Sequence, residues 1–323
     1  MKPRAIELCA GAGGQALGLE MAGFDHVALF ENDKHACATL KANRPHWNVI
    51  NHDLFEDHNW TSYHHVDLVA GGLPCPPFSV AGKQLGEKDD RNLFNVGISI
   101  VEKVRPKAVM FENVKGMLDP RFADYRAMVE GRLRKLGYEH MGWRLLKASD
   151  FGVPQLRPRV VMVAIATSWS AKFLWPEKEM HVEPPSVGQA LEGMMAANGW
   201  RGAKKWAKHA AVIAPTLVGG SKKHGGPDLG PTRSRKAWET LGVDGRGLAN
   251  EAPSKGFIGL PRLTVSMAAR IQGFPNDWVF VGGKTASYRQ VGNAFPPQVA
   301  HSVAKAILAA LTQEKSVRQA KVG

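Results

Sequence analysis

Residues 1–168 alternate between short apolar segments and longer segments with helical spacing, and this alternation constrains the fold more than any other feature. The apolar segments are rich in Val, Ile, Leu and Phe and predict strands over Arg4–Leu8, His26–Glu31, Asn48–Asp53, Val66–Ala70, Ala108–Asn113 and Val160–Ala166. The segments between them predict helices over Gln15–Ala22, Asp33–Ala42, Leu93–Val104 and Arg121–Leu136. Alternating strands and helices build a parallel sheet covered by helices on both faces. We therefore expect an α/β fold with a doubly wound, mostly parallel sheet.

The alternation stops near Ser168, and the composition changes there. Residues 169–262 contain paired glycines, paired lysines and five tryptophans, and the stretch GGSKKHGGPDLGPTRSRK (219–236) has neither a helical nor a strand period. A stretch of this kind can be a flexible linker. The flanking Trp, Val, Ile and Leu residues favour a second, smaller, loop-rich domain with its own core.

Helical spacing returns in the last part of the chain, over Val265–Ile271 and Phe295–Leu311, before a polar tail that we expect to be frayed, Thr312–Gly323. The sequence therefore predicts a first domain over 1–168, a second over 169–262, and a return to the first domain over 263–323.

Positive charge is concentrated in the second half of the chain, which has a formal net charge of +13 overall. Residues 1–168 hold 21 Lys/Arg against 19 Asp/Glu, whereas residues 169–323 hold 21 against 10. A nearly neutral half joined to a basic half fits a chemical module beside a surface that binds a polyanion. A solvated basic face explains the charge equally well.

Neither apolar runs nor cysteines indicate a secreted or membrane protein. No run of 18 apolar residues is present, and MKPRAIELCAGAGG at the start lacks the apolar stretch of a signal peptide. Three cysteines (Cys9, Cys37 and Cys75) make no disulfide framework, and their spacing matches no zinc pattern. We expect a cytoplasmic protein without a metal site.

Cys75 lies in the sequence VDLVAGGLPCPPFS (66–79), just past a predicted strand. Open α/β sheets bind their ligands beyond the carboxyl ends of the strands. Pro74, Pro76 and Pro77 restrict the backbone on both sides, which suits a presented nucleophile. A lone cysteine is more often a small buried side chain, so its role depends on partners elsewhere.

A glycine turn and two acidic residues follow the first three predicted strands. Gly11, Gly13 and Gly14 in ELCAGAGG allow the backbone to approach a ligand, as in many nucleotide-binding proteins. Glu31, at the end of the second predicted strand, can accept hydrogen bonds from ribose hydroxyls. Asp53, at the end of the third, can accept from an adenine amine. Each acid alone also fits a helix cap or a surface carboxylate.

Glu112 in FENV (111–114) closes a very apolar predicted strand, at the sheet edge where Cys75 is expected. Such a glutamate can protonate a ring nitrogen while sulfur attacks a neighbouring carbon, or it can be a capped carboxylate at a strand end. Arg157 and Arg159 in QLRPRV (155–160) share one face of an extended chain. They can hold a carbonyl, a phosphate or the glutamate, and a solvated strand edge is the alternative.

Gly292-Asn293 in YRQVGNAFPPQVA (288–300) predicts a turn and the start of a helix. If the chain returns to the first glycine turn, the Asn293 amide reaches the same ligand.

Taken in order, these segments resemble the cytosine-C5 DNA methyltransferases, and the bacterial modification enzymes in particular. The resemblance covers nearly the whole chain outside 169–262 and rests on six ordered segments. They are ELCAGAGG, GGLPCPPFSVAGKQ, FENV, QLRPR, RLTVSMAARIQGFP (262–275) and GNAFPPQVA.

The resemblance implies catalytic roles. Cys75 attacks C6 of a cytosine flipped out of the duplex, and Glu112 engages N3. Arg159 holds O2 of the base, and Arg157 supports a phosphate, Glu112 or the catalytic loop. The backbone of Leu73–Pro74 accepts from the exocyclic amine.

The resemblance also implies the cofactor, S-adenosylmethionine, on the glycine turn, with Glu31 at its ribose, Asp53 at its adenine amine and Asn293 at its amino-acid end. Leu93 is a further expected contact of this cofactor. Residues 169–262 resemble the variable target-recognition domain of such enzymes. The expected DNA contacts are Pro74, Ser79, Lys222, Lys223, Arg233 and Arg235.

As partners we expect double-stranded DNA and a restriction endonuclease that acts separately, with no membrane and a monomeric enzyme associated with the nucleoid. Three other classes remain open: an RNA cytosine-C5 methyltransferase, a non-catalytic DNA-binding repressor on the same scaffold, and a nicotinamide-binding oxidoreductase. The separate basic region favours duplex DNA over RNA. The set Cys75, Glu112 and Arg159 speaks against a repressor, and an oxidoreductase would leave Cys75 unexplained.

Overall fold

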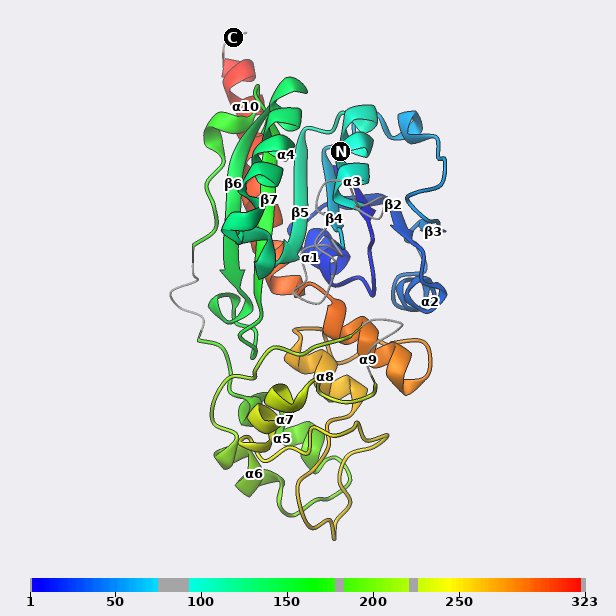
Figure 1. Cartoon of the computed structure of the whole chain (residues 1–323), viewed down its shortest axis with the longest axis vertical. Coiled ribbons are helices and arrows are strands. Elements are labelled where there is room, and N and C mark those ends of the chain that lie inside the picture. The colour runs from blue at the N-terminus through cyan, green and yellow to red at the C-terminus, as the bar shows by residue number, and fades with distance from the viewer. Residues whose placement is uncertain (1, 75–92, 178–182, 221–225, 321–323) are drawn as a thin grey trace.

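The structure is a computed structural model that describes residues 2–74, 93–177, 183–220 and 226–320. Its centre is a sheet of the order β3-β2-β1-β4-β5-β7-β6 (Figure 1). The strands are β1 (Arg4–Leu8), β2 (Asp25–Glu31), β3 (Val49–Asn51), β4 (Leu68–Gly72), β5 (Ala108–Val114), β6 (Tyr138–Lys147) and β7 (Pro158–Ala166). The pairs from β3 to β5 are parallel, whereas β7 runs antiparallel to both β5 and β6. The predicted doubly wound, mostly parallel sheet is confirmed.

The helices that surround the sheet follow the predicted alternation. They are α1 (Gly14–Ala22), α2 (Lys34–Asn43), α3 (Leu93–Val104), α4 (Ala123–Lys135) and α10 (Pro297–Ala320). Alternate residues of each buried strand face opposite layers, because side chains in a strand point to alternate sides. In β1, Ile6 and Leu8 pack with α3 and α4, while Ala5 packs with α1 and α10. Both faces of the sheet are therefore buried at β1.

The remaining helices lie beyond the carboxyl ends of the parallel strands. They are α5 (Val187–Ala196), α6 (Ala203–His209), α7 (Thr232–Glu239), α8 (Val265–Ile271) and α9 (Lys284–Asn293). Figure 1 shows α5, α6 and α7 together at one end of the molecule, with α8 and α9 between them and the sheet. One apolar core joins them, since Trp206 and Trp238 belong to the same buried cluster as Met267 and Tyr288. Single-turn 3₁₀ helices occur at Trp60–Tyr63, Lys115–Leu118, Pro120–Phe122, Ala148–Phe151 and Ser170–Lys172.

Three local predictions differ from the structure. Strand β6, a partly exposed edge strand, was not predicted, and it pairs antiparallel with β7. Gly292-Asn293 ends helix α9 and does not start a helix. Helix α10 continues through most of the predicted frayed tail, to Ala320. The sequence also gave no sign of α7 inside the glycine-rich stretch, where buried Trp238 holds the helix against the core.

Candidate active site

A cavity of about 670 Å³ opens at the carboxyl ends of the five parallel strands, β1 to β5. This volume lies in the range of pockets that hold cofactors and small ligands, about 300–1,000 Å³. Its wall combines strand ends with the return segment around Asn293 and Phe295, which comes from the far end of the chain. The predicted site residues that line it are Gly11, Gly14, Glu31, Asp53, Pro74, Leu93, Glu112, Arg159 and Asn293.

The glycine turn after β1 forms the floor of the cavity. Gly11 has φ 54, and a Cβ there would meet no atom within 4 Å, so the backbone borders open space. Gly13 has φ 86, and its Cβ would come within 2.7 Å of Leu40, so this glycine serves packing and does not line the cavity. At Gly14 a Cβ would collide with the carbonyl oxygen of Phe295. Gly14 thus lets the return segment lie directly against α1.

Glu31 ends β2, and its carboxylate is held from both sides. It accepts hydrogen bonds from the backbone N–H of Gly11 at 2.8 Å and of Asp33 at 2.7 Å. Burial raises the pKa of Glu31, and the two N–H groups partly oppose this shift. Asp53 accepts from Asn32 Nδ2 at 3.2 Å and lines the same cavity. Two fixed carboxylates at neighbouring strand ends suit a ligand with hydroxyl and amine donors.

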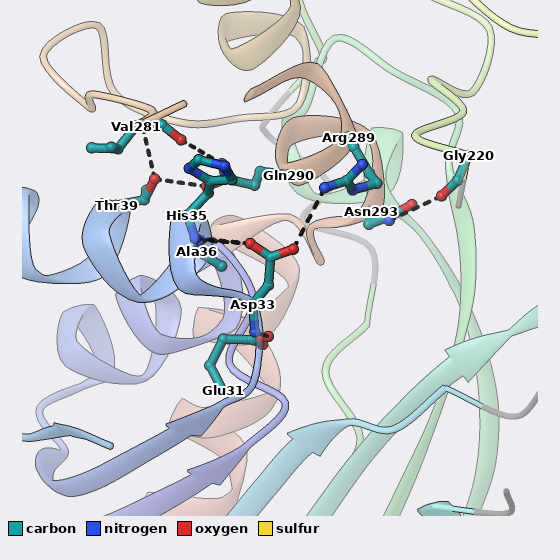
Figure 2. A network of polar contacts seen from close by, with 10 residues as sticks. All are labelled: Glu31, Asp33, His35, Ala36, Thr39, Gly220, Val281, Arg289, Gln290 and Asn293. Atoms are coloured by element: carbon teal, nitrogen blue, oxygen red, sulfur yellow. Dashed lines mark hydrogen bonds and ion pairs between the residues drawn. The ribbon is translucent and has the colours of Figure 1, made fainter. Parts of the chain in front are cut away.

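Asn293, the last residue of α9, lies at the opposite wall (Figure 2). Its Nδ2 donates to the carbonyl of Gly220 at 3.2 Å. Arg289, one turn earlier, reaches Asp33 at 3.5 Å, and Asp33 also caps α2 through the N–H of His35. These contacts hold the return segment against the end of β2.

Glu112 and Arg159 form an ion pair at the other end of the cavity, with Arg159 Nε and Glu112 Oε1 3.0 Å apart. Their side chains are only 12% and 15% exposed. Burial raises the pKa of Glu112, and the charges of Arg159 and Arg157 partly counter this effect. A carboxyl group with a raised pKa is suited to give a proton to a substrate atom and to take it back.

Arg157 lies elsewhere than the pattern predicted. Its backbone has φ 21, so the chain is not extended at this residue and the two arginines do not share a face. The side chain is 1% exposed and donates to the carbonyls of Leu217 at 3.0 Å and Gly292 at 2.8 Å. Arg157 is not among the residues that line the cavity. Its charge still acts on Glu112 through space.

Four predicted residues lie outside the described residues: Cys75, Ser79, Lys222 and Lys223. Arg233 and Arg235 both lie on α7, where Arg233 is exposed and Arg235 donates to the Thr232 hydroxyl at 3.3 Å. Neither arginine is among the residues that line the cavity.

Several cavity residues were missed by sequence reasoning, among them Glu7, Gln15, His52 and Arg289. Glu7 is 1% exposed, and burial raises its pKa well above the ordinary value. The sequence could have identified Glu7, because an acidic residue inside the apolar segment AIELC is unusual. Arg289 carries no comparable signal, since only the tertiary fold brings it to β2.

The part of the chain that the structure describes shows neither a cluster of metal-ligating side chains nor a membrane-spanning helix. No three His, Cys, Asp or Glu side chains there gather as a metal site. No helix there has the length and apolarity to span a bilayer.

Comparison with known proteins gives the family. The model of the C-5 cytosine-specific DNA methylases matches residues 3–309. The type II methyltransferase M.NaeI of Lentzea aerocolonigenes is 52% identical over 98% of this chain and 77% of its own length. M.NgoMIV of Neisseria gonorrhoeae is 50% identical over 97% of this chain and all of its own.

Solved structures agree on the fold. A putative DNA modification methyltransferase encoded within an E. coli prophage has a TM-score of 0.69 at 22% identity, covering 96% of this chain and 99% of its own. A mutant of Spodoptera frugiperda DNMT2 has a TM-score of 0.64 at 19% identity, covering 95% and 99%. The predicted resemblance is confirmed, and this chain belongs to the C-5 cytosine-specific DNA methylases.

Proposed function

We propose that this DNA cytosine-C5 methyltransferase takes its methyl group from S-adenosylmethionine and modifies one short sequence in duplex DNA through a covalent intermediate at Cys75. One observation carries the proposal. The Glu112–Arg159 pair faces the same cavity as Glu31 and Asn293, so groups for a base and groups for a methyl donor line one space.

The described residues fit this donor. Gly11 leaves open space beside a backbone turn, and Gly14 brings the return segment close enough for Asn293 to line the cavity. Glu31 would accept from ribose hydroxyls, Asp53 from the adenine amine, and Asn293 would hold the amino-acid end. Leu93, the first residue of α3, lines the same cavity and would add an apolar contact. When bound, the donor supplies an electrophilic methyl group.

The chemistry of the base rests on Cys75, Glu112 and Arg159. Cytosine C5 is a weak nucleophile, and transient covalent addition divides one difficult step into easier ones. The Cys75 sulfur would bond to C6 while Glu112 gives a proton to N3, which leaves an enamine whose C5 carries the nucleophilic electron pair. After methylation, a base would take the C5 proton, the C5–C6 double bond would re-form as the C6–sulfur bond breaks, and the N3 proton would return to Glu112. Burial of Glu112 supports its protonated form, and Arg159 would orient the carboxyl group and bind O2 of the base.

The basic region would supply recognition of the duplex. We propose 169–262 as the target-recognition domain, with Lys222, Lys223, Arg233 and Arg235 at phosphates or guanine edges, and Pro74 and Ser79 beside the flipped base. The enzyme would act as a monomer in the cytoplasm, near the nucleoid, with a restriction endonuclease that binds the same sequence independently.

Mass spectrometry of the intact protein tests the nucleophile. Because fluorine at C5 cannot leave as a proton does, a duplex with 5-fluorocytosine at the target and S-adenosylmethionine should give a stable adduct. We expect this adduct with the wild type and none with Cys75→Ala, which should still bind the duplex. An active wild type that forms no adduct, or a methylating Cys75→Ala variant, would overturn the assignment. Methylation of tRNA with no methylation of any duplex would instead favour an RNA substrate.

A further inference from the structure

Residues 217–220 cross from the region of α5–α7 to the cavity, and we call them the strap. At one end, the Leu217 side chain is buried in the cluster that contains Trp238 and Val243. At the other end, Gly220 lines the cavity beside Asn293, which donates to its carbonyl (Figure 2). The strap therefore belongs to both parts of the molecule.

Two buried side chains from the segment before β7 hold the Leu217 peptide groups from both sides. Gln155 Oε1 accepts from the Leu217 N–H at 2.8 Å, and Arg157 Nη1 donates to the Leu217 carbonyl at 3.0 Å. Gln155 is fully buried and Arg157 is 1% exposed. Both backbone polar groups of Leu217 are thus fixed by side chains 60 and 62 residues away in sequence.

The same two side chains also bind the elements that lie beneath the strap. Gln155 Nε2 donates to the Ile271 carbonyl at 3.2 Å and to Gln272 Oε1 at 2.7 Å. Arg157 Nη2 donates to the Gly292 carbonyl at 2.8 Å, next to Asn293. Gln155 and Arg157 therefore connect the strap to the ends of α8 and α9.

The strap lies directly on the end of α9, without room for adjustment. A Cβ at Gly219 would come within 2.7 Å of the Arg289 carbonyl and 2.8 Å of the Asn293 nitrogen. A Cβ at Gly292 would collide with the backbone of Gly219. Because packed protein interiors do not deform continuously, a shift of the strap must move the Asn293 end of the cavity wall, and the reverse holds as well.

A buried arginine is costly to desolvate, and an apolar side chain of similar volume often gives equal or greater stability. Here burial lowers the pKa of Arg157 well below its ordinary value, and Glu112 partly restores it. An apolar residue could not bind two carbonyls on two different segments. The geometry of these contacts, more than stability, is what Arg157 contributes.

We propose that Gln155 and Arg157 are positioning residues that fix the strap, and that the strap couples binding of the methyl donor to binding of the duplex. The inference rests on the proposed function, because it takes S-adenosylmethionine and duplex DNA as the two ligands. A donor that reaches Asn293 meets the residue that holds Gly220, and a duplex on the recognition region acts on the other end of the strap. Coupling of this kind is reciprocal, and typical values change affinity about 5- to 150-fold.

Titration calorimetry on the full chain tests the coupling. The affinity for S-adenosylhomocysteine is measured with and without a saturating duplex that carries the target sequence, and the ratio is the coupling factor. We expect a factor of about five or more in the wild type. Gly219→Ala should reduce it to near one and raise the KM for donor and duplex together. Gly193→Ala is the matched control, because its Cβ on α5 would meet nothing within 4 Å.

Arg157→Lys keeps the charge but lacks the planar fork whose Nη1 and Nη2 bind the two carbonyls, and it is the second test if Gly219→Ala does not fold. A merely structural role would lower Tm and the active fraction and leave the coupling factor at the wild-type value. That result in either folded variant, or a factor of one in an active wild type, overturns the inference. A wild type that binds neither ligand and methylates nothing would remove the proposed function as well, so the two failures are distinct.

Discussion

A double-mutant cycle on Glu112 and Arg159 measures the coupling free energy of their ion pair, and the burial of the pair sets the value that we expect. Removing one partner of a buried ion pair costs about 3–5 kcal/mol, because the other charge stays buried and unpaired. These side chains keep 12–15% exposure, so we expect the lower end of the range, about 3 kcal/mol, for Arg159→Met. Glu112→Gln can still accept a hydrogen bond from Arg159 and should cost about 1–2 kcal/mol.

The double variant should be less destabilised than the sum of the two singles, since it leaves no unpaired carboxylate. Thermal unfolding measures the difference. At about 2 °C per kcal/mol for a chain of this size class, Arg159→Met should lower Tm by about 6 °C. Equal destabilisation by Arg159→Met with and without Glu112→Gln would show no coupling and would refute the reasoning. Both single variants should also lose methyl transfer on a duplex substrate.

The stability of Arg159→Met should also change with pH in a direction that the pKa of Glu112 predicts. Burial raises the pKa of Glu112 in the folded chain, and Arg159 is the main charge that opposes the shift. The pKa of Glu112 already lies above the unfolded value of 4.5 in the wild type, and loss of Arg159 raises the folded pKa further, so the folded variant keeps its proton to still higher pH. Its stability must therefore fall as pH rises from 4.5 through the folded pKa. The deficit of Arg159→Met should be small near pH 5 and largest above neutrality.

Three further predictions concern the cavity and the basic region. Gly14→Ala should destabilise the protein by about 1–3 kcal/mol and weaken donor binding, because its Cβ collides with the Phe295 carbonyl. The control Gly131→Ala, on α4, should stabilise the protein by up to about 1 kcal/mol. Thermal unfolding and donor titration compare the two variants. Glu7→Gln should remove a loss of stability with rising pH, because burial raises the pKa of Glu7, and denaturant midpoints at pH 5 and 8 check this. Affinity for the duplex should fall steeply as the salt concentration rises, since residues 169–323 are strongly basic. A duplex affinity that does not change with salt concentration would contradict the role of charge.

The parallel part of the sheet was predictable because it is buried on both faces. Such strands are continuous apolar runs, and the bounds of β1 and α3 agree with the prediction at every residue. Strand β6 carries the opposite signal. Its sequence YEHMGWRLLK is mixed, and most of its residues are partly exposed at the sheet edge. Nothing in its composition separates it from a loop, although it forms the edge strand that pairs along β7.

The short helices beyond the sheet are held by tertiary packing more than by local signals. Helix α5 was accessible, since Ser186 and Gln189 form a capping box at its start. Helix α7 was not, because its mean composition is polar and one buried residue, Trp238, anchors it. Isolated helices of this length are marginal in water, which explains why the pattern alone does not indicate them.

The paired arginines show what a sequence motif does not predict. In QLRPR, spacing places Arg157 and Arg159 two residues apart and predicts one shared face. The structure separates them, because Arg157 precedes β7 with φ 21 while Arg159 pairs with Val114 and Leu146 inside the sheet. The partners of Arg157 are 60 and 135 residues away, so no local pattern contains them. A motif thus identifies which side chains lie near a site, but the backbone conformation and distant carbonyls decide which of them face the ligand and which hold the wall.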